Sequence, residues 1–131
     1  MRIAVISFNT QGDELATKLS EAISVDIFSK KNITDFNIGE LAGDLMSKYE
    51  GVIFISSTGI AVRAIAPFIK DKVTDPAVVV IDTFGRYVIS LLSGHLGGAN
   101  ELTELVAKII NGQAIITTAT DNIGVLAPDV L

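Results

Sequence analysis

The chain has 131 residues, of which 49% are hydrophobic and 19% are charged, with a formal net charge of -5 and no cysteine. This length suits one domain with a buried core, and the lack of cysteine excludes disulfides and thiolate metal sites. The negative charge argues against nucleic acid or an anionic membrane as a general partner, and no apolar run reaches the roughly 20 residues that cross a bilayer.

Six short segments rich in β-branched residues predict β-strands. Four of them are nearly continuous apolar runs, which is typical of strands covered on both faces in a parallel sheet. The segment SVDIF alternates more between polar and apolar residues, so we expect it near an edge of the sheet. In chain order the six segments are RIAVISF (2–8), SVDIF (24–28), VIFIS (52–56), AVVVID (77–82), YVISLL (87–92) and AIITTA (114–119).

Apolar residues recur at helical spacing in four of the stretches between these segments. They are Leu15, Leu19, Ala22 and Ile23, then Leu41, Leu45 and Met46, then Ala61, Ile65 and Phe68, and finally Leu102, Leu105, Val106 and Ile109. Pro67 is expected to kink or end the third helix. Strands that alternate with helices predict an α/β fold, with a three-layer open, mostly parallel sheet of flavodoxin-like or Rossmann-like type.

A hairpin is expected to interrupt the parallel pattern. Only TFGR separates AVVVID from YVISLL, and four residues containing Gly85 suit a β-hairpin, so one antiparallel strand pair is predicted. The chain has no internal repeat and no evident linker, and residues 1–121 are expected to form a single α/β domain. The tail TDNIGVLAPDVL carries no capped element, and residues 122–131 are expected to begin a middle or linker segment.

Polar and glycine residues gather in four loops that follow predicted strands. Ligands of open α/β sheets bind beyond the carboxyl ends of the strands, so these loops are candidate binding loops. If residues 87–92 run parallel to the other strands, all four loops meet at one end of the sheet. The alternative is that Ser, Thr and Gly serve as turn and cap residues. The loop residues are Asn9, Thr10, Gln11 and Gly12; Ser56, Ser57, Thr58 and Gly59; Ser93, Gly94, His95, Gly97 and Gly98; and Thr117, Thr118, Thr120 and Asp121.

The single histidine of the chain, His95, lies in the run SGHLGGANE just before a predicted helix. An imidazole can act near neutral pH as a general base, a hydrogen-bond donor or a metal ligand. The alternative is a structural histidine that caps a turn. Gly94, Gly97 and Gly98 favour a loop whose backbone approaches a ligand closely, with Asn100 in the first turn of the helix that follows.

Two arginines could supply positive charge to such a site. Arg63 follows Thr58 and Gly59 by about one helical turn, so its guanidinium is expected near the start of that helix. Arg86 lies in the predicted hairpin beside aromatic residues and could hold a carboxylate. The alternatives are that Arg63 lies on a solvated helix face and that Arg86 is an exposed side chain of the turn with no binding role.

Several common sites are excluded by their own motifs. The chain contains no G-x-G-x-x-G, no P-loop and no G-x-S-x-G nucleophile elbow, and FNT and SST stand where a phosphorelay receiver needs acidic residues. One histidine without cysteine makes a closed zinc site difficult to assemble, and no metal site is expected. A phosphate loop in SFNTQGD leaves a flavin-binding domain open as an alternative.

Four blocks in order carry a resemblance to a known family. They are STGIAVRAIAP (57–67), KDKVTDPAVVVID (70–82), LLSGHLGGANELT (91–103) and TTATD (117–121). Together they resemble the N-terminal region of the CbiG family of cobalamin-biosynthesis proteins. The similarity covers about residues 50–131 strongly and residues 1–49 in general pattern only.

The resemblance implies a cobalt-precorrin-5A hydrolase of anaerobic cobalamin (vitamin B12) biosynthesis. Such an enzyme opens the δ-lactone on ring A of the macrocycle and releases a two-carbon fragment as acetaldehyde. Family proteins are longer, with a middle segment and a C-terminal domain, so this chain is expected to be part of an enzyme whose partner is that domain or a separate chain. The substrate carries the cobalt, so no cofactor is expected, and MRIAVISFNTQGDE lacks a signal peptide, which favours the cytoplasm.

The resemblance also implies roles for the candidate residues. His95 is expected to be the catalytic base that activates water against the lactone carbonyl. The expected substrate-binding residues are Thr58, Gly59, Arg63, Arg86, Ser93, Gly94, Gly97, Gly98 and Asn100. The candidate oxyanion donors are the backbone N–H groups of Thr58, Gly59, Gly97 and Gly98. The two arginines are candidates for binding the carboxylates of the substrate. Two alternatives stay open: His95 as an axial ligand of cobalt, and a non-catalytic tetrapyrrole-binding or assembly domain.

Overall fold

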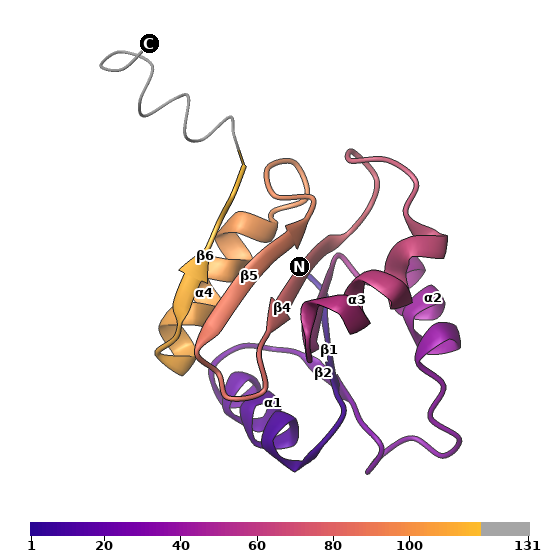
Figure 1. Cartoon of the computed structure of the whole chain (residues 1–131), viewed down its shortest axis with the longest axis vertical. Coiled ribbons are helices and arrows are strands. Elements are labelled where there is room, and N and C mark those ends of the chain that lie inside the picture. The colour runs from indigo at the N-terminus through magenta and orange to yellow at the C-terminus, as the bar shows by residue number, and fades with distance from the viewer. Residues whose placement is uncertain (119–131) are drawn as a thin grey trace.

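The computed structural model describes residues 1–118, which form one mixed sheet between two layers of helices (Figure 1). The predicted middle segment 122–131, together with Thr120 and Asp121, lies outside the described residues. The six strands lie in the order β2-β1-β3-β4-β5-β6. Their bounds are Ile3–Ser7 for β1, Asp26–Phe28 for β2, Gly51–Ile55 for β3, Ala77–Ile81 for β4, Tyr87–Leu92 for β5 and Gln113–Ile115 for β6.

The helices form where the apolar spacing predicts them. Their bounds are Thr10–Ala22 for α1, Ile38–Lys48 for α2, Thr58–Ile65 for α3 and Ala99–Ile110 for α4. Pro67 falls in a short 3₁₀ helix, Ala66–Phe68, so α3 ends just before it, as predicted. Helices α1 and α4 pack on one face of the sheet, and α2 and α3 pack on the other. The three-layer α/β prediction is confirmed.

The core is built on the three central strands. Every side chain of β1, β3 and β4 is buried, because alternate residues point into the two helical layers. Val5 and Ile53 face α1 and α4, whereas Ile6 and Phe54 face α2 and α3. These continuous apolar segments therefore need no polar face.

The two edge strands differ in how well the sequence predicts them. β2 lies at one edge and is half-exposed, as its alternating pattern predicts. β6 forms the opposite edge and covers only Gln113–Ile115, which is shorter than the predicted segment 114–119 and only partly buried. The prediction that this last apolar run is a strand covered on both faces is therefore wrong, because β6 has a neighbouring strand on one side only.

The hairpin decides the direction of the last two strands. β1, β2, β3 and β4 are mutually parallel, but β5 is antiparallel to β4 and β6 is parallel to β5. The Asp82 carboxylate accepts the Tyr87 N–H (2.6 Å), and Gly85 takes a φ of 71°, which closes the turn. We call the end of the sheet that holds residues 82–86 the hairpin end, and the opposite end, which holds residues 93–98, the His95 end.

Tyr49 joins α2 to the edge strand β2. Its hydroxyl donates a hydrogen bond to Asp26 Oδ2 (2.6 Å), and the Arg2 guanidinium lies 4.6 Å from the centre of its ring. The hydrogen bond to Asp26 is the largest cause of a pKa for Tyr49 above the ordinary 10.0, and burial adds to it.

We therefore expect Tyr49 to ionise at higher pH than an ordinary tyrosine. Subtracting the ultraviolet titration of Tyr49→Phe from that of wild type gives the titration curve of Tyr49 alone. Because the folded pKa is raised, the stability this group contributes is complete below pH 10.0 and is lost as the pH rises through the folded value. In Asp26→Asn the titration should return toward the ordinary pKa. A curve identical to wild type in that variant would contradict the assignment of Asp26 as the cause.

Candidate functional site

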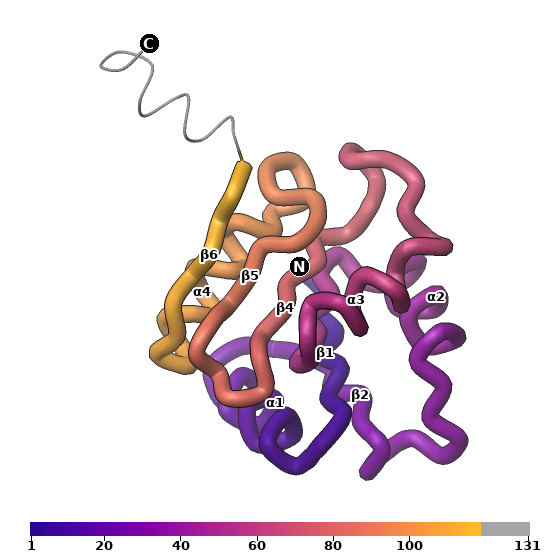
Figure 2. The backbone as a smooth tube through the Cα atoms, in the orientation of Figure 1, coloured from indigo at the N-terminus to yellow at the C-terminus, as the bar shows by residue number. Residues whose placement is uncertain are grey.

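The predicted site residues fall at two opposite ends of the sheet. One group lies at the His95 end and consists of Ser93, Gly94, His95, Gly97, Gly98 and Asn100. The other group lies in the hairpin or in α3, which begins at the hairpin end, and consists of Thr58, Gly59, Arg63 and Arg86. The six residues of β5 separate Arg86 from Ser93, which is roughly 20 Å at about 3.3 Å per residue. Figure 2 shows the loop after β5 and the hairpin before it at opposite ends of the strand.

The prediction of one shared set of binding loops is therefore wrong. A hairpin after β4 forces β5 to run against β1, β3 and β4, so the hairpin and the single set of loops exclude each other. The loops after β1 and β3 lie at the hairpin end, while the loop after β5 and Thr118 lie at the His95 end. His95 must therefore be considered with neighbours other than the two arginines.

The His95 loop, residues 93–98, turns the chain from β5 into α4. Ser93 and Gly98 both have left-handed backbone conformations, with φ of 61° and 85°. The first N–H groups of α4 are satisfied within the loop, because Ala99 N–H donates to the Ser93 carbonyl (3.1 Å) and Asn100 N–H to the Gly94 carbonyl (3.0 Å). The His95 side chain is exposed, so its ring is accessible to a ligand.

Two glycines of the loop are explained by packing within the protein. A Cβ on Gly97 would lie 2.4 Å from Ser93 Cβ and 2.9 Å from the Ser93 carbonyl oxygen. A Cβ on Gly94 would lie 2.8 Å from both Asn100 Oδ1 and Thr118 Cγ2. The close approach that these glycines permit is thus made by neighbouring protein atoms, without need of a ligand.

Asn100 ties three elements together at the His95 end. Its side-chain oxygen accepts a hydrogen bond from Ser90 Oγ on β5 (2.7 Å), and its side-chain nitrogen donates to Thr118 Oγ1 beyond β6 (3.0 Å). Its side chain, predicted to bind substrate, therefore has a structural use that the sequence did not indicate.

Replacing Asn100 with alanine is expected to lower the free energy of unfolding by about 1–3 kcal/mol, because partly buried partners on both sides lose a hydrogen bond. Asn100→Asp keeps an acceptor for Ser90 and adds a carboxylate to the first turn of α4, so it should cost less. Urea unfolding of wild type, Asn100→Asp and Asn100→Ala measures the three free energies of unfolding, which should decrease in that order. Equal stability of wild type and Asn100→Ala would contradict a structural role for this side chain.

A cavity of about 600 Å³ opens beside His95, which is within the usual range for small-molecule sites. Its walls come from three separate segments, and it is lined by Lys72, Ser93, Gly94, His95, Leu96 and Thr118. Lys72 and Leu96 were not among the predicted site residues, although both lie in blocks that carry the family resemblance. Long-range folding alone brings Lys72 to His95.

The described residues indicate no metal centre and no membrane span. Within residues 1–118, no group of three or more His, Cys, Asp or Glu side chains is arranged to hold a metal ion. No helix in that range is long and apolar enough to cross a membrane. A second cavity of about 330 Å³ lies beside α2 and contains none of the predicted site residues.

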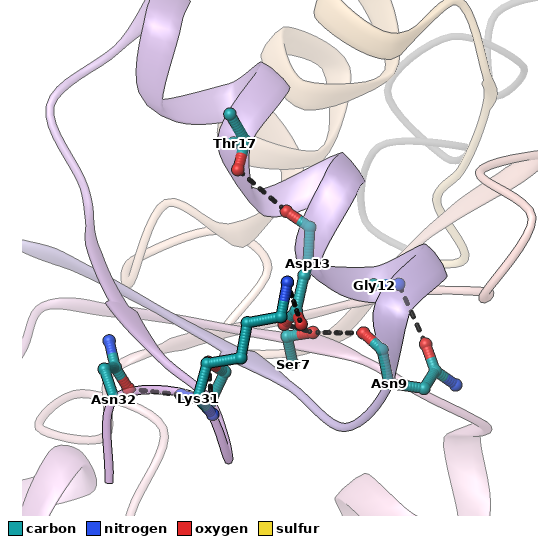
Figure 3. Close-up of polar contacts among 8 residues, drawn as sticks. Ser7, Asn9, Gly12, Asp13, Thr17, Lys31 and Asn32 are labelled. Atoms are coloured by element: carbon teal, nitrogen blue, oxygen red, sulfur yellow. Dashed lines mark hydrogen bonds and ion pairs between the residues drawn. The ribbon is translucent and has the colours of Figure 1, made fainter.

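At the hairpin end, the segment SFNTQGD uses its polar groups to start α1 (Figure 3). Ser7 Oγ donates to Asp13 Oδ1 (2.7 Å), and Gly12 N–H donates to Asn9 Oδ1 (2.8 Å), which makes Asn9 the helix cap. Lys31 Nζ lies 3.5 Å from the other Asp13 oxygen. A carboxylate at this position disfavours a phosphate. The Ser7 hydroxyl and the Gly12 N–H, which a flavin phosphate would need, already bond to Asp13 and Asn9, so the structure does not support the flavin alternative.

The two arginines are exposed, and each lies where its place in the sequence predicts it. Arg63 is exposed and its guanidinium lies over the start of α3, since a Cβ on Gly59 would be 3.3 Å from Arg63 Nη1. Arg86 is exposed in the hairpin, with its guanidinium 5.4 Å from the centre of the Phe84 ring. With Arg86 at the far end of β5 and Arg63 on the helix that starts at that end, neither is among the residues that line the His95 cavity.

Comparison with known proteins agrees with the resemblance carried by the sequence. Residues 40–121 match the family model described as cobalamin synthesis G N-terminal. The chain belongs to this family. Over 126 residues it is 42% identical to the cobalt-precorrin-5A hydrolase of Salmonella typhimurium, covering 91% of this chain and 36% of that protein. It is 44% identical over 131 residues to the enzyme of the same name from Priestia megaterium, covering 90% of this chain and 35% of that protein.

A solved structure of the family agrees with the fold. The crystal structure of a cobalamin biosynthesis protein G homologue from Sulfolobus solfataricus has a TM-score of 0.72 and 31% sequence identity, covering 88% of this chain and 36% of that one. The chain thus spans about a third of the length of these cobalamin synthesis G proteins.

Proposed function

We propose that this chain is the N-terminal part of a cobalt-precorrin-5A hydrolase that opens the ring A lactone and releases acetaldehyde. The observation that carries the proposal is 42–44% identity to two hydrolases of that name over about nine-tenths of the chain. The substrate is a cobalt corrinoid, and its cobalt is the only metal that the proposal needs. A biosynthetic intermediate as substrate supports a cytoplasmic location.

His95 is proposed as the catalytic base because its exposed side chain lines a cavity of about 600 Å³. Its imidazole takes a proton from water as the water oxygen attacks the lactone carbonyl carbon. The ester bond between the carbonyl carbon and the ring oxygen then breaks, and the proton passes to the leaving oxygen. Hydrolysis leaves a carboxylate and a two-carbon alcohol that is still attached to the macrocycle. Loss of the hydroxyl proton then forms the C=O bond of acetaldehyde as the carbon–carbon bond to the macrocycle breaks, and the electron pair of that bond stays on the macrocycle.

The oxyanion donors need revision from the sequence prediction. Thr58 and Gly59 lie at the far end of the sheet from His95, and Gly98 N–H already donates to the His95 carbonyl (3.3 Å). Of the four predicted backbone donors, Gly97 N–H is the one that we retain.

A second function is supported by the length of the match. The chain spans about a third of the length of each relative. The catalytic groups can therefore lie in the part of the enzyme that this chain does not match, whether that part is a C-terminal domain or a partner chain. This chain would then bind the tetrapyrrole or support assembly without catalysis.

One assay separates the two functions. The purified chain is mixed with cobalt-precorrin-5A, binding is followed by the corrinoid absorbance, and acetaldehyde is measured by NADH oxidation with alcohol dehydrogenase. The full-length Priestia megaterium enzyme serves as the positive control. Acetaldehyde release by this chain is expected, whereas corrinoid binding without release would favour the non-catalytic function. Neither binding nor release would contradict both.

A further inference from the structure

Lys72 brings a positive charge to the His95 cavity from a different part of the chain. It is the one lysine or arginine among the described residues that line the cavity. Within residues 1–118 the ion pairs involve Lys31, Lys48 and the N-terminus, and none involves Lys72. An anionic ligand therefore finds a cation here that no carboxylate of the described chain neutralises.

The acidic residues beside Lys72 are engaged in shaping its loop. Asp71 Oδ1 accepts the N–H groups of Val73 (2.6 Å) and Thr74 (3.3 Å), so the turn folds around Lys72. The buried Asp75 carboxylate accepts Lys70 N–H, with both oxygens 3.0 Å from the nitrogen. Both carboxylates accept backbone N–H groups, and neither forms an ion pair with the ammonium group.

A hydrogen bond joins the Lys72 loop, residues 69–76, to the His95 loop. Ser93 Oγ donates to the Asp75 carbonyl oxygen (3.2 Å), at the base of both loops. Figure 1 shows the two loops standing at the same end of the sheet, one after β5 and the other before β4. Because both loops are anchored at this point, Lys72 and His95 line the same cavity.

We propose that Lys72 binds a carboxylate of the ligand that occupies the His95 cavity. The ligand class is a polycarboxylate macrocycle, an identity that rests on the proposed function. The chain has a net charge of -5, so a ligand of this kind needs a local cation, and the two arginines lie elsewhere. Leu96, which is 71% exposed and lines the same cavity, offers an apolar contact for the ring.

Two cobalt corrinoids test the proposal directly. Cobyrinic acid carries free carboxylates around the ring, whereas cobinamide carries amides at those positions. We expect wild type to bind cobyrinic acid more tightly, and Lys72→Gln to raise its Kd about fivefold while changing the Kd for cobinamide little. Lys72→Arg should keep most of the affinity. The affinity of wild type for cobyrinic acid should fall more steeply with added salt than that of Lys72→Gln.

The matched control is Lys48→Gln. Lys48 is an exposed lysine of α2 that pairs with Asp44 (2.8 Å) and is not among the residues that line the cavity. This variant should bind both corrinoids like wild type, and thermal unfolding should confirm that all variants fold.

Several outcomes separate this proposal from the proposed function. Equal affinity of wild type and Lys72→Gln for cobyrinic acid overturns the role of Lys72, even if acetaldehyde is released. Failure of wild type to bind cobyrinic acid overturns it as well. Binding that depends on Lys72 without acetaldehyde release supports the role of Lys72 and counts against catalysis by this chain alone.

Discussion

Replacing His95 with alanine is expected to lower acetaldehyde release about 100-fold or more, with little change in melting temperature. General base catalysis commonly contributes a factor of about 10²–10⁴, and the chain has no second histidine to replace the first. The side chain is exposed in a loop, so its removal takes little area from the core. The measurements are acetaldehyde release, corrinoid binding and thermal unfolding of the same preparations.

His95→Gln is the control that keeps a polar side chain but cannot act as a base at neutral pH. Added imidazole should restore part of the activity of His95→Ala if the ring serves as a base. An axial ligand would instead be detected as a shift of the corrinoid absorption bands in wild type that His95→Ala abolishes. A large drop in melting temperature with unchanged corrinoid binding would mean that the histidine is structural.

Replacing Gly97 with alanine is expected to cost about 1–3 kcal/mol of folding free energy and to weaken corrinoid binding. The added methyl group would lie 2.4 Å from Ser93 Cβ and 2.9 Å from the Ser93 carbonyl, closer than atoms can pack. The loop must therefore shift, and His95 lies within it. Gly39→Ala is the control, because there the nearest atom would be 3.4 Å away, which is ordinary contact.

The double variant Ser93→Gly/Gly97→Ala distinguishes packing from ligand approach. Glycine at position 93 removes the Cβ that clashes and suits the φ of 61°, although it also loses the hydrogen bond to Asp75. If Gly97 is required for packing against Ser93, the double variant should recover part of the stability and binding that Gly97→Ala loses. The recovery is partial because the Cβ contact is removed, whereas the 2.9 Å contact with the carbonyl oxygen of residue 93 remains. Recovered stability without recovered binding would mean that the ligand itself needs the space at Gly97. Ser93→Gly alone gives the baseline.

Most elements of this fold could be predicted from the sequence, because the patterns that specify them are local. Continuous apolar runs predicted β1, β3 and β4, and alternation in SVDIF predicted the edge strand β2. Pro67 marked the end of α3 because it lacks an N–H and clashes with the preceding turn. The four residues after β4 predicted the hairpin, and the ordered blocks around His95 predicted the family.

Which loops lie together depends on how distant segments of the chain pack. The position of a loop depends on the direction of its strand, and pairing with β4 made β5 antiparallel, which separated Arg86 from His95 by the length of that strand. The same pairing placed Lys72 beside His95. The two residues are far apart in the chain, and the residues next to each of them in the sequence do not indicate that they line one cavity. Gly97 illustrates the same limit of sequence-based prediction. A glycine in the sequence indicates that other atoms approach its backbone closely, but not whether those atoms belong to a ligand or to Ser93. Patterns of neighbouring residues specify local conformation, whereas a binding site is made by long-range packing.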